Sequence, residues 1–87
     1  MIISAACRGV VNGEYGTFPV MRHADFFVWM KLLHCDYNKA EIEQGFIDWN
    51  EERGNGKFVS REEAAKLAYE YGQIKEPKNE IFSEDLW

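Results

Sequence analysis

The sequence has little of several features that define common classes of protein. It contains only two cysteines in 87 residues, Cys7 and Cys35, and neither lies in a C-x-x-C or zinc-finger spacing. We therefore expect two reduced thiols packed in a core. No apolar run approaches the roughly 20 residues that span a bilayer, and the first residues lack the basic segment of a signal peptide. These absences predict a soluble protein of a reducing cytoplasm, with no membrane as partner.

Positive charge is also scarce. Ten Lys and Arg residues stand against fifteen Asp and Glu residues, which gives a net charge of −5. Proteins that bind nucleic acid broadly need a basic surface that releases phosphate counterions, so no nucleic-acid partner is expected. The balance is compatible with a small anionic ligand held by a few arginines. It is equally compatible with an acidic surface directed at a basic protein partner.

Large aromatic side chains are plentiful, with three Trp, four Tyr and six Phe. A chain of this length forms one domain, here residues 1–87, and buries only about 60 % of the surface that its unfolded form exposes. Aromatic rings supply much buried area per residue. If one copy cannot cover them all, the chain associates with itself, so we expect a homo-oligomer, most simply a dimer.

The pattern predicts an α+β fold in the order β-β-α-β-β-α, followed by a C-terminal tail. Asn12-Gly13 is a strong hairpin signal, Pro19 suggests a bulge or an edge strand, and Ser60 with Glu63 forms a capping box. Two hairpins should form a small antiparallel sheet with two helices on one side. The expected elements are strands at 2–11 and 15–21, a helix at 23–35, strands at 44–49 and 57–59, and a helix from 61 that ends at Gly72.

The first predicted helix is apolar on nearly every side. It is therefore either the central helix of the core or part of a subunit interface. The tail, 75–87, also carries large apolar groups and is expected to dock on the domain or on a neighbour. The apolar residues of the helix are Phe26, Phe27, Val28, Trp29, Met30, Leu32 and Leu33, and those of the tail that should be buried are Phe82, Leu86 and Trp87.

Both predicted helix starts carry a cation. Arg22 and His23 open the first helix, and Arg61 opens the second, with Lys57 nearby in sequence. Free N–H groups at a helix start bind anions, and an arginine adds a fork suited to phosphate. The alternative is structural: Arg61 pairs with Glu62 or Glu51, and Arg22 only covers a carboxylate.

His23 is the one candidate acid–base group by position, yet nothing near it in sequence could act as a nucleophile. His34 lies eleven residues further on, about 16 Å along a helix, so one metal ion cannot bridge the two. A packed or capping role is the alternative for His23. We expect no catalytic residue, no metal and no cofactor, and hence no enzyme.

Aromatic residues on the predicted strands could grip a base. Alternate residues of a strand point to opposite faces, so Phe46 and Trp49 cannot share a face. One of them, or Phe58, would then be exposed near the arginines, where rings stack on bases. The alternative is that all are core or interface. The candidate ligand-binding residues are Arg22, His23, Phe46, Trp49, Lys57, Phe58 and Arg61.

Four segments together resemble a family of small bacteriophage proteins. Its members carry an Arg-His pair at the first helix start, a QGF…G.FV.R.EA segment, a GQI exit and a closing SEDLW. The matching segments here are Arg22-His23, 44–47 with 56–64, 72–74 and 82–87. The loop at 51–55 is longer than in that pattern.

The resemblance implies a phage accessory protein acting in the host cytoplasm. Such proteins are commonly counter-defence factors, and one class, the sponges, sequesters nucleotide second messengers such as cyclic oligonucleotides or cyclic ADP-ribose variants without cleaving them. The resemblance carries Arg22, His23, Phe46 and Arg61 into that role. Two alternatives stay open: an inhibitor that binds a host defence protein through its acidic surface and tail, and a small hydrolase that uses His23.

Overall fold

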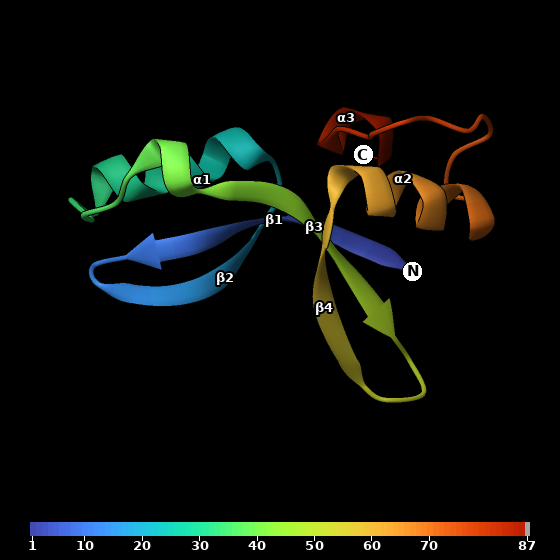
Figure 1. The fold of residues 1–87 in the computed structure, drawn as a ribbon, viewed down its shortest axis with the longest axis horizontal. Helices are drawn as coiled ribbons and strands as arrows, with labels where there is room; N and C mark the ends of the chain where they lie inside the picture. Colours follow the sequence, from blue (N-terminus) through green and yellow to red (C-terminus); the bar gives the residue numbers. More distant parts are fainter. Residues whose placement is uncertain (87) are drawn as a thin grey trace.

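The computed structural model describes residues 1–86 of the chain. Four strands form one antiparallel sheet in the order β2-β1-β3-β4, and the helices cover one side of it (Figure 1). The expected α+β order, β-β-α-β-β-α with a C-terminal tail, is confirmed. The elements are β1 (Ile2–Val11), β2 (Glu14–Val20), α1 (His23–Leu32), the 3₁₀ turn η1 (Lys39–Glu41), β3 (Glu43–Asn50), β4 (Asn55–Ser60), α2 (Arg61–Glu70) and α3 (Ser83–Leu86).

The first hairpin turns where the sequence predicts it. Asn12 and Gly13 both have positive φ, 51° and 82°, which is the backbone of a type I′ turn. The β1–β2 register runs without interruption from Ala5–Val20 to Val11–Glu14. Pro19 therefore marks an edge strand and not a bulge, because an edge residue needs no second ladder bond.

The two hairpins diverge from the centre of the sheet, and each has its own helix (Figure 1). Two buried clusters result, one under each helix. The cluster under α1 contains Cys7, Val11, Phe26, Met30 and Ile42. The cluster under α2 contains Ile2, Ala5, Phe46, Val59, Ala64, Ala65, Ala68, Ile74 and Ile81.

The first helix is shorter and less buried than predicted. It ends at Leu32 instead of Cys35 because His34 adopts a positive φ of 54°, which cannot continue a right-handed helix. Its buried residues are His23, Phe26 and Met30. The prediction of a central core helix is therefore wrong: α1 packs one face on a single sheet.

The second helix has the ends that the sequence predicts. Ser60 Oγ accepts the Glu63 backbone N–H at 3.1 Å. Gly72 has a φ of 76°, and the next N–H, of Gln73, donates to the Ala68 carbonyl at 2.8 Å, a Schellman-type exit. The strands before it are longer than expected, so the hairpin loop narrows to residues 51–54.

Gln73 explains the GQI segment in structural terms. Its side-chain oxygen accepts the Ile2 N–H at 2.8 Å, and its amide nitrogen donates to the Ile2 carbonyl at 2.9 Å. The β1–β2 pairing begins only at Ala5, so this amide replaces a neighbouring strand at the start of β1. The following residue, Ile74, is buried in the core under α2.

The tail docks as expected, but through different residues. Ile81 is fully buried and Ser83 is 3 % exposed, whereas Phe82 is 44 % exposed. The prediction that Phe82 is buried is therefore wrong, because its ring lies over Arg61 at the surface. Leu86 packs partly against the core, and Trp87 lies outside the described residues. Among residues 1–86, no helix is long and apolar enough to cross a membrane.

Candidate functional site

The starts of α1 and α2 meet over the middle of β3. His23 Nε2 lies 2.7 Å from the carbonyl oxygen of Gly45, and Arg61 Nη2 donates to Gln44 Oε1 at 2.7 Å. Residues 38 positions apart in the sequence are thereby joined, since Arg61 Nη2 also lies 3.5 Å from His23 Nδ1. We call His23, Gln44, Arg61 and Phe82 the junction.

The contacts of His23 determine its protonation. A carbonyl oxygen only accepts, so Nε2 must carry the proton that it donates to Gly45, and Nδ1 keeps its lone pair. That lone pair faces the Arg61 guanidinium. Burial lowers the pKa of His23 below its usual 6.5, and Arg61 lowers it further, against the opposing effects of the Gly45 bond and Glu84. The ring is therefore neutral at pH 7.

Arg61 is the central cation of the junction. Its guanidinium carbon lies 4.8 Å from the centroid of the Phe82 ring, within the range of a cation–π contact. Its Nε is buried and has no hydrogen-bond partner among the described residues. Within residues 1–86, Arg61 forms no ion pair with Glu51 or Glu62, so the expected structural alternative does not account for it.

Arg22 caps α1 next to the junction. Its backbone N–H donates to Asp25 Oδ2 at 3.2 Å, and its carbonyl accepts the Asp25 N–H at 3.0 Å. The carboxylate of Asp25 therefore already interacts with the start of this helix.

The structure brings together only some of the predicted site residues. His23 and Arg61 are in contact, Arg22 is adjacent, and Phe46 lies beneath, with its ring centroid 5.2 Å from that of His23. Phe46 is fully buried, so it belongs to the core and cannot stack on a ligand. The Lys57 side chain is mostly exposed, and its Nζ lies 4.0 Å from Glu63 Oε1 at the start of α2.

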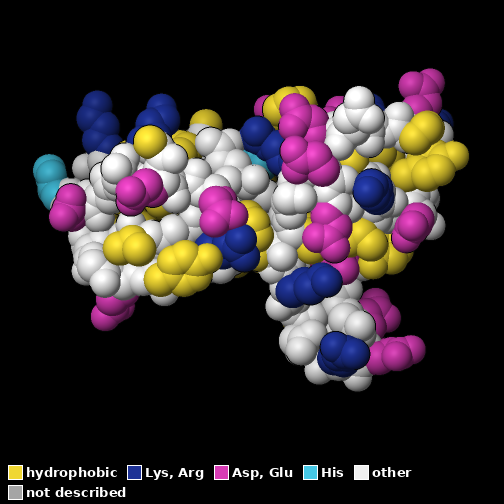
Figure 2. Space-filling view, in the orientation of Figure 1, with side chains coloured by type: hydrophobic (Ala, Val, Ile, Leu, Met, Phe, Trp, Pro, Cys, Tyr) yellow, Lys and Arg dark blue, Asp and Glu magenta, His cyan; other side chains and the backbone are white. Residues whose placement is uncertain are grey.

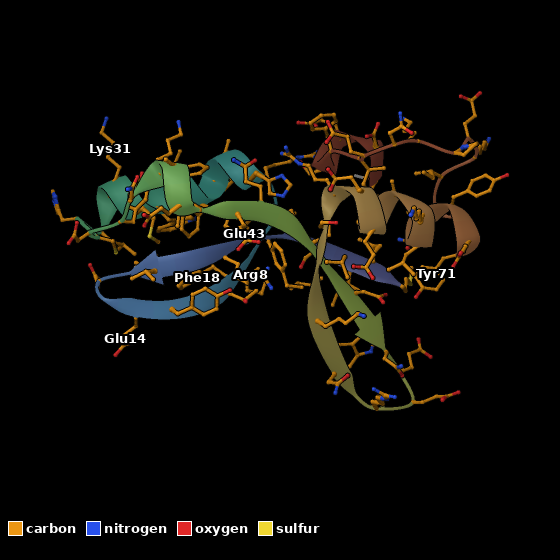
Figure 3. All side chains as sticks on the ribbon, viewed as in Figure 1. Arg8, Glu14, Phe18, Lys31, Glu43 and Tyr71 are labelled. Carbon is orange, nitrogen blue, oxygen red and sulfur yellow. The ribbon has the colours of Figure 1, made fainter. Side chains whose placement is uncertain are left out.

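Trp49 and Phe58 lie on the helix-free face of the sheet, away from the junction. Phe58 pairs with Ile47 across the strands, and the guanidinium carbon of Arg8 lies 4.1 Å from the centroid of its ring. Arg8 Nη2 also donates to Glu43 Oε2 at 2.7 Å, so the side chains of Arg8 and Glu43 form an ion pair on the surface of the sheet (Figure 3). Arg8 and Glu43 are direct cross-strand partners, a pairing that the strand register, but no motif, could have revealed.

Two members of the junction were missed by sequence reasoning, Gln44 and Phe82. Gln44 opens the QGF segment, and alternation along β3 places its side chain on the same face as Phe46, where it meets Arg61. Phe82 gave no signal because its position depends on how the tail folds back. No group of three or more metal-binding side chains is present in residues 1–86.

Comparison with known proteins agrees with the resemblance noted in the sequence. The model of the family described as Phage T4 y16D protein matches residues 1–87. No curated protein and no solved structure matches the chain. Because the family match covers the whole chain, this protein belongs to the phage T4 y16D protein family.

Proposed function

We propose that this phage protein is an accessory, counter-defence factor that binds a small anionic, nucleotide-like ligand at the junction and sequesters it in the host cytoplasm without cleaving it. The observation that carries the proposal is the Arg61 guanidinium, which lies where the two helix starts meet and forms no ion pair with a carboxylate among the described residues. A phosphate oxygen is the acceptor that a guanidinium fork fits best.

The electrostatics around Arg61 favour an anion despite the net charge of −5. The start of α2 lies beside Arg61, and the N-terminal end of this ten-residue helix carries partial positive charge. Acidic and basic side chains are interspersed over the face seen in Figure 2, without a continuous basic patch. A small ligand is therefore supported better than a polymeric nucleic acid.

Phe82 is better placed for stacking on a base than the strand aromatics Phe46, Trp49 and Phe58. Its ring lies beside the Arg61 guanidinium and is 44 % exposed. A nucleobase can stack on an exposed ring next to an arginine. The ligand would thus contact Arg61 through phosphate and Phe82 through its base.

Binding without turnover is supported by the state of His23. Nε2 is committed to the Gly45 carbonyl, and the Nδ1 lone pair faces a cation. A general base needs a free lone pair within reach of the proton that it removes. The hydrolase alternative would require this ring to leave its position in the core.

The alternative of an acidic decoy for a host protein has less support. Asp85, in the acidic tail, has one oxygen 2.7 Å from Lys78 Nζ and the other 2.8 Å from the Phe82 N–H. These contacts lower the pKa of the Asp85 carboxyl, the Lys78 bond being the larger cause. This part of the tail is used to hold the tail itself together.

Native mass spectrometry and calorimetry against cyclic oligonucleotides and cyclic ADP-ribose variants test the proposal. Arg61→Gln should weaken binding of a confirmed ligand by about ten-fold or more, since a hydrogen bond to a charged group contributes about 1.5–3 kcal/mol. The matched control is Arg53→Gln, in the exposed β3–β4 loop, which should bind as wild type does.

Three results would overturn the proposal. Wild-type protein could bind none of these nucleotides, or a folded Arg61→Gln variant could bind as tightly as wild type. A ligand recovered in altered form would refute sequestration without cleavage. Phe82→Ala provides a second variant, with an expected loss of several-fold, if Arg61→Gln does not fold.

A further inference from the structure

The side of α1 that faces away from the sheet is apolar and uncovered. Val28 is 55 % exposed, Trp29 56 %, Leu32 64 % and Leu33 61 %. Residues four apart lie on one face of a helix, so Ala24, Val28 and Leu32 form a ridge, which lies opposite the buried Phe26 and Met30. We call Ala24, Val28, Trp29 and Leu32 the outer face of α1, and Leu33, the first residue after the helix, is exposed beside it.

We infer that the outer face of α1 is the interface with a second copy of this chain, packed antiparallel across a two-fold axis at Val28. A two-fold interface brings the same surface of both copies together. Positions 24 and 32 are equally far from position 28, so the large Leu32 of one copy meets the small Ala24 of the other. The ridge is therefore complementary to itself in size.

The charges beside this face favour a copy over a strongly charged partner. Asp25 and Lys31 flank the ridge, and Lys31 points away from the sheet (Figure 3). The face is thus locally neutral although the chain carries a net charge of −5. An acidic or a basic partner would find no complementary charge here, whereas two neutral apolar faces do not repel each other.

The exposed apolar side chains supply part of the area that a small dimer needs. Val28, Trp29, Leu32 and Leu33 are each more than half exposed, and together they offer on the order of 400 Å² per copy, with the Trp29 ring as the largest part. A stable interface takes about 800 Å² from each partner, and its rim is polar. An open groove of about 640 Å³, lined by Phe27, Val28, Lys31 and Tyr37 among others, borders the ridge and extends the contact surface.

Sedimentation velocity across about 1–100 µM protein tests this inference. Wild-type protein should sediment with the mass of two chains. Val28→Glu places two carboxylates against each other at the axis and should give single chains. The matched control is Tyr69→Glu, an exposed residue on the outside of α2 that is 48 % exposed, and it should remain a dimer.

Mixing complementary variants makes the test specific for the pairing at Val28. Val28→Lys alone should also be monomeric, and an equimolar mixture with Val28→Glu should recover the mass of two chains. Circular dichroism confirms that each variant is folded, and Leu32→Glu replaces Val28→Glu if it is not. A wild-type monomer at all concentrations, a dimeric Val28→Glu, or a mixture that stays monomeric would overturn the inference.

Discussion

The two main helices have the same length and pack on the same sheet, yet their outer surfaces differ completely. In α2 the buried residues are Ala64, Ala65 and Ala68, and the outward positions are charged. In α1 the buried residues include the large Phe26 and Met30, and the exposed positions include Val28, Trp29 and Leu32 as well as Lys31. The exposed charged residues of α2 are Glu62, Glu63, Lys66 and Glu70.

The difference follows from what else the chain supplies. Small alanines let α2 lie close to β3 and β4, and the segment after it folds back to bury Ile74 and Ile81 in the same cluster. The segment after α1 likewise adds Tyr37 and Ile42 to the cluster under α1, but it leaves Val28, Trp29 and Leu32 more than half exposed. The outside of α2 is therefore largely charged, whereas the outside of α1 presents an exposed apolar face.

The largest effect should come from removing an aromatic core residue on either side. Phe46, under α2, and Phe26, under α1, are 0 % and 1 % exposed. Phe46→Ala and Phe26→Ala should each lower the free energy of unfolding by about 3–5 kcal/mol. Urea denaturation followed by circular dichroism and by fluorescence measures this loss. Coincident transitions would show that the two halves unfold together, and separate transitions after Phe26→Ala would show that they do not.

The tail allows a second comparison, between neighbouring residues. Ile81 is fully buried whereas Phe82 is 44 % exposed. Ile81→Ala should therefore lower the free energy of unfolding by about 2–4 kcal/mol, and Phe82→Ala by about 1 kcal/mol or less, even though phenylalanine is larger. Thermal melting of both variants provides the measurement. Equal losses would contradict the docking of the tail through Ile81.

Local signals predicted the fold well, and contacts between distant residues explain what they missed. Asn12-Gly13, the Ser60 cap and Gly72 each specify a backbone conformation without help from the rest of the chain. The end of α1 could not be read in this way, because the apolar pattern continues past Leu32 into residues that leave the helix. The need for glycine at position 45 could not be predicted from local sequence either. A Cβ there would lie 2.5 Å from the Phe58 ring, and only the sheet register shows that these two residues are neighbours.

The candidate site was predictable only where local sequence signals were enough. Anion-binding chemistry at helix starts identified Arg22, His23 and Arg61 from the sequence, and the structure places His23 and Arg61 in contact. The choice between Phe46, Trp49 and Phe58 required knowledge of which face the helices cover. Phe82 could not be identified at all, since its ring reaches Arg61 only after the tail folds back.

The capped start of α2 should make a smaller contribution. Ser60 Oγ accepts the Glu63 N–H, and loss of such a cap costs about 1 kcal/mol. Ser60→Ala should lower the free energy of unfolding by this amount in urea denaturation, while Ser60→Asp, which keeps an acceptor, should leave it almost unchanged. A similar loss in both variants would mean that the side-chain bond is not what stabilises this helix start.

The smallest effect should be a dependence of stability on pH that comes from His23, where the two halves meet. Because burial lowers the pKa of folded His23 below its usual 6.5, the unfolded chain binds a proton at a higher pH than the folded chain does. As the pH falls below about 6.5, stability should therefore decline, by at most about 1.4 kcal/mol per pH unit for one proton. Above that range His23 is neutral in both states, and its contribution should be constant.

Urea denaturation between pH 7.5 and 5 (values on the order of the histidine range) measures the slope. His23→Gln should remove the slope, and the exposed His34→Gln should keep it. A slope that persists in His23→Gln would show that another group is responsible. That group would not be the Asp85 carboxyl, because Lys78 lowers its pKa and it titrates at a more acidic pH.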